Sequence, residues 1–487
     1  MPYVYPGSEP VLAFVIGFIP CVFFALAYAW LGSSMPRAGG EYIFISRTIS
    51  PALGYIVSIG SFLARFFGLG FGLVVDVALW GVALRILGKG TGNMALTNFG
   101  TFLSTADPIT IIAGAILLLL SIWLIVTVGG KPFFVYIALT WLVPVAGAIV
   151  IILLSVGNPF NALTYSKAWD AIWGAGSYNE ITTIAAKTGW TPSAPNFDAT
   201  IRAVAGAAIY AYIGFHNPAQ WAGEIKNPRR NVMIGIIVSL LFSGVLFIGL
   251  ASTVFYSGGN FISQYAWAYY KAREQFVITP RIEPILAIFA VIFTGGNIVV
   301  AFLIATAGAF GGYHGAAGTM METRRVFALA FDRFFPERFA YISERFHTPI
   351  WAIAFLMVGS TIGIILSSPI LGPLRGLAGG INATFMYLLG HMFTGLALAL
   401  LPIIKPEIYE GIKLHFKGLP IPAICGVVAF VSGLLFFGIN AQTTQILDIT
   451  ITSIVLGIGL ILFLYYSYKN QKMGVDVKAI MSEIPPE

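Results

Sequence analysis

An apolar helix interrupted by glycine and proline holds the polar groups best suited to binding chemistry. Its interrupted end runs from Ile209 to Pro218, with Gly214 and Pro218 four residues apart. Glycine costs helix stability and proline removes a backbone donor, so this pair predicts a helix that unwinds and frees backbone carbonyls and amides. A broken helix of this kind can present amides to an anion such as a carboxylate. A proline kink that serves only packing is the alternative.

The side chains around this break suggest distinct roles in a binding site. We expect the Gly214 region to contact a carboxylate, and His216 to make a polar or proton-linked contact, since histidine exchanges protons near neutral pH. A neutral, hydrogen-bonded His216 stays open as the alternative. The segment predicted to bind a substrate comprises Tyr210, Ile213, Gly214, Phe215, His216 and Asn217, with Tyr210, Ile213 and Phe215 forming a wall that sets its shape.

Arg65 and Asp76 are charges inside one long apolar stretch, where an ionisable residue is a functional candidate. Eleven helical residues place them on one side but about 16 Å apart. Each therefore needs another partner. We expect Arg65 to meet Glu224 or line an inner vestibule, and Asp76 to meet Arg202 or a cationic group of a substrate. Purely structural pairs are the alternative.

A second group of charges lies in segments between apolar stretches. Arg37, Arg47, Glu224 and Arg325 are predicted to form a charged gate around an inner mouth. The simpler alternative is that these arginines extend from helix ends toward water and hold their loops in the cytoplasm.

The elements that position these residues are apolar helices. Of 487 residues, 58% are hydrophobic and 10% charged, with a mean hydropathy of +0.86. Ordinary soluble proteins carry about 25% charged residues, so a large soluble enzyme is excluded. A bilayer-spanning helix takes about 20 mainly apolar residues. This length predicts eleven spans, near 11–32, 52–87, 108–128, 133–156, 200–222, 232–256, 284–321, 349–368, 376–401, 419–438 and 446–466.

The distribution of basic residues predicts the orientation. Most of the 27 Lys and Arg residues fall in one set of alternate loops, which places the C-terminus in the cytoplasm. The two longest polar segments, 157–199 and 257–283, then lie outside. Three tryptophans in the first suit short helices at the membrane interface, where the segments could form a lid or a passive connector.

Several functions find no support in the sequence. The net charge of +7 is spread over short loops rather than a basic stripe, so no nucleic-acid partner is expected. Cys21 and Cys425 both lie in apolar stretches, and no histidines have metal-ligand spacing. No nucleophile is paired with a base. We expect no enzymatic activity, no metal and no cofactor.

Three motifs resemble those of the amino acid/polyamine/organocation (APC) transporters. The segment 210–215 followed by 224–228 is similar to that family's sixth-helix signature. The Pro-Arg-Ala-Gly-Gly-Glu-Tyr stretch at 36–42 resembles the segment that follows the family's second helix. Residues 325–332, with Pro336, resemble the segment that follows its eighth helix. These motifs occur in family order over about 300 residues.

This resemblance implies an all-α polytopic membrane protein with two inverted five-helix repeats and two further helices, the LeuT-like fold, in which this chain holds eleven of twelve spans. In family numbering it begins at helix two, so either Met1 is not the true start or a member has lost part of its site. The predicted regions are 1–199 for the first repeat (helices two to five, with outer loop 157–199), 200–402 for the second (helices six to ten) and 403–487 for two final helices and a cytoplasmic tail.

Positions at which this sequence differs from the family pattern bear on the identity of the coupling ion. Many relatives have an acidic residue where this chain has His216, and proton-coupled members can carry a helix-five lysine that 133–156 lacks. The helix-eight stretch 305–319 is poor in hydroxyls, which argues against sodium. Its small residues favour close packing, with Tyr313, His314 and Thr319 as further substrate-contact candidates.

We therefore expect an APC permease that takes up amino acids or related amines across a prokaryotic plasma membrane by alternating access, with a proton as a possible coupling ion. The substrate and the oligomeric state are not predicted. The alternative is a non-transporting membrane subunit or sensor that keeps the scaffold and binds a partner protein.

Overall fold

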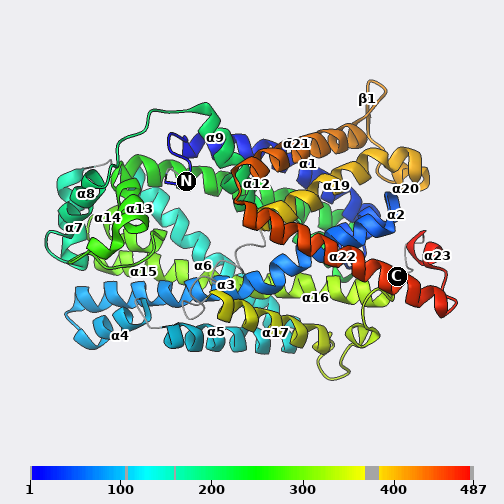
Figure 1. Cartoon of the computed structure of the whole chain (residues 1–487), viewed down its shortest axis with the longest axis horizontal. Helices are drawn as coiled ribbons and strands as arrows, with labels where there is room; N and C mark the ends of the chain where they lie inside the picture. The colour runs from blue at the N-terminus through cyan, green and yellow to red at the C-terminus, as the bar shows by residue number, and fades with distance from the viewer. Residues whose placement is uncertain (1–2, 105–107, 158–160, 368–382, 483–487) are drawn as a thin grey trace.

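The computed structural model describes residues 3–104, 108–157, 161–367 and 383–482. Long helices run side by side along the molecule, with short helices gathered at its two ends (Figure 1). The long helices are α1 (Pro10–Ser34), α3 (Pro51–Thr91), α5 (Pro108–Val128), α6 (Gly130–Gly157), α12 (Pro228–Gly258), α15 (Ile298–Phe310), α16 (Gly315–Phe331), α17 (Ile350–Ser367), α19 (Ala383–Ile404), α21 (Ile421–Thr443) and α22 (Ile446–Lys472).

The short elements connect these helices and cover the ends of the bundle. They are α2 (Glu41–Thr48), α4 (Met94–Ser104), α7 (Ala162–Trp173), α8 (Ser177–Lys187), α9 (Phe197–Ala203), η1 (Val204–Ala208), α10 (Ile209–Tyr212), α11 (Asn217–Gln220), η2 (Ala222–Glu224), α13 (Phe261–Ala272), η3 (Arg273–Gln275), η4 (Leu286–Phe289), α14 (Ala290–Phe293), η5 (Gly312–His314), η6 (Glu337–Ala340), α20 (Pro406–Glu410), the hairpin β1 (His415–Phe416) and β2 (Leu419–Pro420), and α23 (Val477–Ser482).

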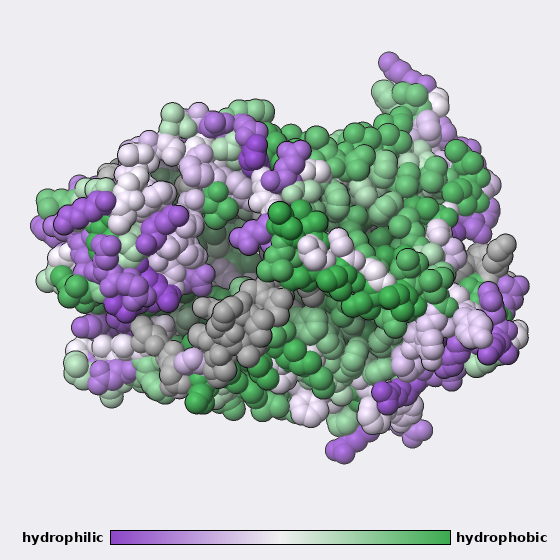
Figure 2. All heavy atoms as spheres, in the orientation of Figure 1, coloured by the Kyte–Doolittle hydropathy of each residue, from purple (hydrophilic) through white to green (hydrophobic). Residues whose placement is uncertain are grey.

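The predicted all-α membrane architecture is confirmed. Within the described ranges, ten helical stretches are long and apolar enough to cross a membrane. A broad apolar surface covers the long helices, and polar side chains gather at the two ends (Figure 2). The remaining predicted span, the fifth at 200–222, is divided among α9, η1, α10 and α11. The sequence predicted a break there.

The predicted span 284–321 was wrong at both ends. Residues 286–293 form the short helices η4 and α14, which belong to the same hydrophobic core as the polar segments 157–199 and 257–283. The span itself begins at Ile298, after positive φ angles at Gly295 and Gly296, and runs through α15, η5 and α16 to Phe331. It continues past residue 321 because the charged residues of α16 have buried partners. The predicted span 376–401 lies partly outside the described residues, and α19 extends to Ile404.

The two long polar segments meet at one end of the molecule. Helices α7, α8, α13 and α14 cluster there, whereas α20 and α23 lie at the opposite end (Figure 1). Trp169 is fully buried between Phe261, Tyr265 and Phe289, with ring centroids 5.0 to 5.8 Å away. Both segments thus share one hydrophobic core. The two repeats proposed from the resemblance remain a prediction.

Close helix crossings use glycine. A Cβ on Gly70 of α3 would lie 2.1 Å from the carbonyl oxygen of Ser360 in α17, and one on Gly363 would lie 2.1 Å from that of Phe67. Only glycine permits this approach, and van der Waals contact between backbones then holds the two helices together.

Candidate functional site

The break at Gly214 leaves backbone groups without helical partners. Helix α10 ends at Tyr212, Ile213 is extended with ψ 132°, and Gly214 has φ +133°, a conformation that favours glycine. Pro218 then lies in the first turn of α11, where its missing N–H costs nothing. The N–H groups of Gly214, Phe215 and His216 donate to no other described residue. They can therefore receive an anion.

One side of the break is open and the other is packed. Tyr210 is 47% exposed, and Ile213, Gly214 and Asn217 are half-buried. Phe215 and His216 are buried against α1 and α19. The gap between Ile213, Phe24 and Leu388 has no room for a water-sized sphere. Any ligand must approach from the side of Tyr210.

His216 lies in a cluster of aromatic rings. Its ring centroid is 5.0 Å from that of His391, 5.3 Å from Tyr28 and 5.8 Å from Tyr387. The Nδ1 of His391 donates to the backbone oxygen of Tyr387 at 2.5 Å, while neither ring nitrogen of His216 has a hydrogen-bond partner within the described chain. The sequence did not connect these residues, because they lie on three separate helices.

A buried charge cluster lies between α2, α11 and α16. The Arg325 guanidinium is 2.6 Å from the Glu41 carboxylate and 3.1 Å from that of Glu322. Arg325 also donates to the Ser58 carbonyl oxygen at 3.2 Å, and the Gln220 amide donates to Glu41. Arg325, Glu41 and Glu322 are at most 1% exposed. The expectation that Arg325 lies in an inner loop was wrong, because its charge is compensated inside a helix.

Two further ion pairs lie near this cluster. Arg47 meets Asp332 at 2.6 Å, and Tyr42 donates to the same carboxylate at 2.7 Å. Glu224 receives Arg324 through two hydrogen bonds of 2.6 and 3.0 Å. The predicted gate residues are thus divided among separate pairs. Arg37 is half-buried and forms no ion pair with the residues described.

The glycines of the 36–42 motif bring this loop to the broken helix. Gly39 has φ +110° and donates to the Gln220 carbonyl oxygen at 3.0 Å. A Cβ on Gly40, which has φ +49°, would lie 2.5 Å from the Gln220 side chain. The loop therefore needs glycine at both positions in order to carry Glu41 to Gln220 and Arg325.

The expected pairs of Arg65 with Glu224 and of Asp76 with Arg202 were wrong, while an inner vestibule for Arg65 and a cationic substrate group for Asp76 stay predictions. Glu224 pairs with Arg324, and Arg202 pairs with Asp198 at 2.7 Å. Arg65 instead lies over the Tyr387 ring, 5.7 Å from its centroid, and beside Gly318. Asp76 is buried against Gly312, where a Cβ would overlap its carboxylate.

The contacts described for the helix-eight candidates are with other residues than those of the 210–217 segment. Tyr313 contacts Trp80, Tyr136 and Phe310, with ring centroids 5.9 to 6.4 Å away. The Thr319 hydroxyl donates to the carbonyl oxygen of Gly315 in its own helix at 3.1 Å. The side chain of His314 is not among those described. Within the described structure, no ring contact of Tyr313 and no hydrogen bond of Thr319 reaches the break at Gly214.

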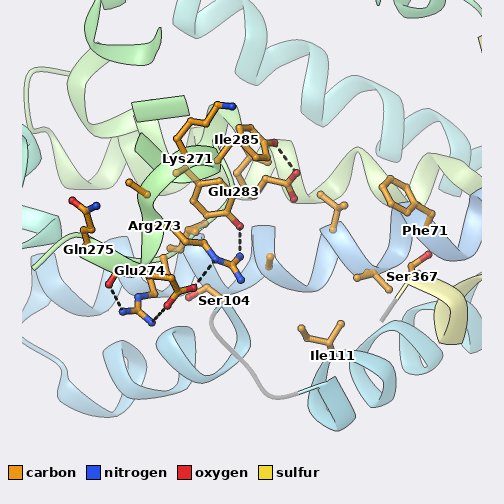
Figure 3. A pocket seen from close by; sticks show the side chains of 18 residues that line it. Phe71, Ser104, Ile111, Lys271, Arg273, Glu274, Gln275, Glu283, Ile285 and Ser367 are labelled. Atoms are coloured by element: carbon orange, nitrogen blue, oxygen red, sulfur yellow. Dashed lines mark hydrogen bonds and ion pairs between the residues drawn. The ribbon is translucent and has the colours of Figure 1, made fainter. Parts of the chain in front are cut away.

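A pocket of about 750 Å³ lies between the outer segments and the middle of α3 (Figure 3). Polar side chains of 269–283 line one side, and Phe71 and Ile111 lie opposite. Several of its polar groups already have partners: Arg281 meets Glu274 at 3.2 Å, Tyr270 donates to Glu283 at 3.1 Å, and Lys271 lies over the Trp267 ring.

Among the described residues, no group of three or more His, Cys, Asp or Glu side chains is placed to hold a metal ion. What the site offers is free amides, aromatic walls and buried charges.

Comparison with known proteins assigns these features to a family. Residues 3–464 match the model of the amino acid permease family, to which this chain belongs. The branched-chain amino acid permease BcaP of Bacillus subtilis (strain 168) is 23% identical over 96% of this chain and 88% of its own length. The glutamate/serine transporter AimA of the same organism is 24% identical over 96% and 77%. The aspartate-proton symporter of Bacillus subtilis (strain 168) is 24% identical over 51% of this chain and 41% of its own length.

Family membership confirms the resemblance read from the three motifs, and it implies the LeuT-like fold of many helices. The relatives are transporters, so an amino acid transporter is supported and an enzyme is not.

Proposed function

We propose that this chain takes up amino acids across the plasma membrane by alternating access, with its C-terminus in the cytoplasm and a proton as the coupling ion. The observation that carries this proposal is the break at Gly214, whose three free N–H groups lie beside the exposed Tyr210 in a member of the amino acid permease family. Backbone amides at a helix break suit the carboxylate that all amino acids share.

The surroundings of the break favour an amino acid with an uncharged side chain. Ile213 and Phe215 are apolar, and the ionisable side chain of the segment, His216, is enclosed by aromatic rings. Arg65 lies over the ring of Tyr387, whose centroid is 5.8 Å from that of His216. We propose that His216 acts as a neutral polar contact and not as the proton carrier. The first substrates to test are the branched-chain amino acids that the BcaP relative is named for.

The test is uptake of labelled amino acids into proteoliposomes at several pH values. Gly214→Ala is expected to reduce uptake at least about tenfold, because alanine is strained at φ +133° and would close the break. Gly457→Ala in α22, where no atom lies within 4 Å of a new Cβ, is the matched control.

His216→Gln separates the two roles of this residue. A neutral contact predicts a changed substrate affinity with an unchanged pH profile, whereas a proton carrier predicts a lost pH dependence. If purified wild-type protein takes up no amino acid and instead co-purifies with a partner protein, the transport proposal is wrong and the accessory-subunit alternative takes its place.

A further inference from the structure

Glu322 is a buried carboxylate with little to stabilise its charge. It lies on α16 with no exposed surface, and neither of its oxygens accepts a hydrogen bond from a described residue. Its ion pair is with Arg325 at 3.1 Å, one turn away on the same helix. A carboxylate removed from water without hydrogen bonds costs far more free energy than the neutral acid does in the same place.

Glu41 holds the stronger position in the same cluster. Its carboxylate is 2.6 Å from Arg325 and accepts the Gln220 amide, so it keeps charge-assisted contacts that Glu322 lacks. Two carboxylates therefore share one guanidinium unequally. If one of them takes up a proton, Glu322 is the one that loses fewer interactions.

Arg65 supplies the second positive charge. It packs beside Gly318, one turn before Glu322 on α16. The cluster of Arg65, Arg325, Glu41 and Glu322 is neutral when all four are ionised. A proton on Glu322 would leave one net positive charge.

The position of Arg65 directs that charge toward the open side of the break. Its side chain is half-buried and lies over the ring of Tyr387, whose centroid is 6.5 Å from that of the exposed Tyr210. The nearby titratable groups that carry no permanent charge are Tyr28 of α1, Tyr210 of α10, His216 at the break, and Tyr387 and His391 of α19. The neighbouring Arg47–Asp332 and Arg324–Glu224 pairs each have no net charge when both members are ionised.

We propose that Glu322 is the proton-binding residue of this transporter, and that its protonation releases Arg65 to attract the substrate carboxylate. The proton adds to the Glu322 carboxylate on the side where substrate binds, and it leaves when substrate departs on the other side. This inference rests on the proposed amino acid transport and names the residue that couples it.

The test compares wild type with Glu322→Gln, which mimics the protonated acid. With one proton per amino acid, a pH difference of one unit supports about tenfold accumulation. We expect wild type to accumulate substrate and to acidify the vesicle interior. The glutamine variant is expected to exchange labelled for unlabelled substrate but to lose both accumulation and acidification. Glu410→Gln, in an exposed pair with Lys413, is the control for an unrelated glutamate.

A second measurement reads the proton directly. Infrared difference spectra between alkaline and acidic pH are expected to show the carbonyl band of a protonated carboxylic acid in wild type, and the glutamine variant is expected to lack it. Glu322→Asp is made alongside, because it keeps a titratable carboxylate if the amide does not fold, and its band is expected at a shifted frequency.

The outcomes separate this inference from the proposed function. Uptake without proton movement, undiminished accumulation by the glutamine variant, or an infrared band unaffected by both substitutions would each overturn the assignment of Glu322 while leaving amino acid transport intact. Failure of wild type to move any amino acid would overturn the transport proposal itself, whatever the infrared spectra show.

Discussion

Asp332→Ala tests whether the buried charges are held by their partners. The Asp332 carboxylate is 3% exposed, lies 2.6 Å from the fully buried Arg47 guanidinium and accepts the Tyr42 hydroxyl at 2.7 Å. Removing one member of a buried pair leaves the other charge uncompensated, at roughly 3 to 5 kcal/mol. The lost acceptor of Tyr42 belongs to the same network, so its contribution is not added separately. The equilibrium constant for unfolding should rise by about two to four orders of magnitude.

Thermal unfolding in detergent measures this effect. Asp332→Asn is expected to fall between alanine and wild type, because an amide can still accept the Tyr42 hydroxyl but carries no charge. Glu410→Ala breaks an exposed pair with Lys413 and should cost less than about 1 kcal/mol. If Asp332→Ala is no more destabilising than Glu410→Ala, the reasoning from burial is refuted.

Two further predictions concern the outer segments and the middle of α3. The Glu180 carboxylate accepts the backbone N–H groups of 277–279 at 2.6 to 3.3 Å; partial burial raises its pKa, but these bonds and the Thr279 contact outweigh burial and hold the pKa below its ordinary value. Because the pKa is lowered, Glu180 contributes stability above the unfolded pKa of about 4.3, and this stability is lost as the pH falls through the folded pKa. Glu180→Gln should therefore speed amide exchange at 277–279 about tenfold or more at neutral pH. Equal protection of these amides in both proteins would contradict the prediction. Gly312→Ala should lower the stability of the fold by about 1 to 3 kcal/mol, because its Cβ would overlap the Asp76 carboxylate. Gly308→Ala is the control, since a Cβ on Gly308 has no atom within 4 Å. Equal stability of the two variants would count against this packing.

The sequence predicted those parts of the structure that depend on local composition. Apolar runs of sufficient length marked the spans, and Gly214 with Pro218 marked the broken helix, because both signals lie within a few residues of each other. The family motifs added the fold, which no local signal could supply.

Long-range pairing could not be read from the sequence. Glu41 and Arg325 are far apart along the chain, and nothing local shows that they meet. Without that contact, Arg325 looks like a loop residue, and the hydropathy signal ends the span at residue 321 rather than at Phe331. The same limit misassigned the partner of Arg65, since Tyr387 lies on a distant helix.

The ion pairs at Glu41–Arg325 and Arg47–Asp332 have a thermodynamic consequence for any opening at this end of the bundle. Separating buried charges in the presence of water restores hydration, which offsets the lost attraction. Exposing apolar side chains of the same size to water would cost about 25 cal/mol for every Å² of surface, and no hydration energy would offset that cost. If these ion pairs close one end of the bundle, the closed and open states therefore differ little in free energy. Because the hydration of charge weakens on heating, warming should favour the closed state.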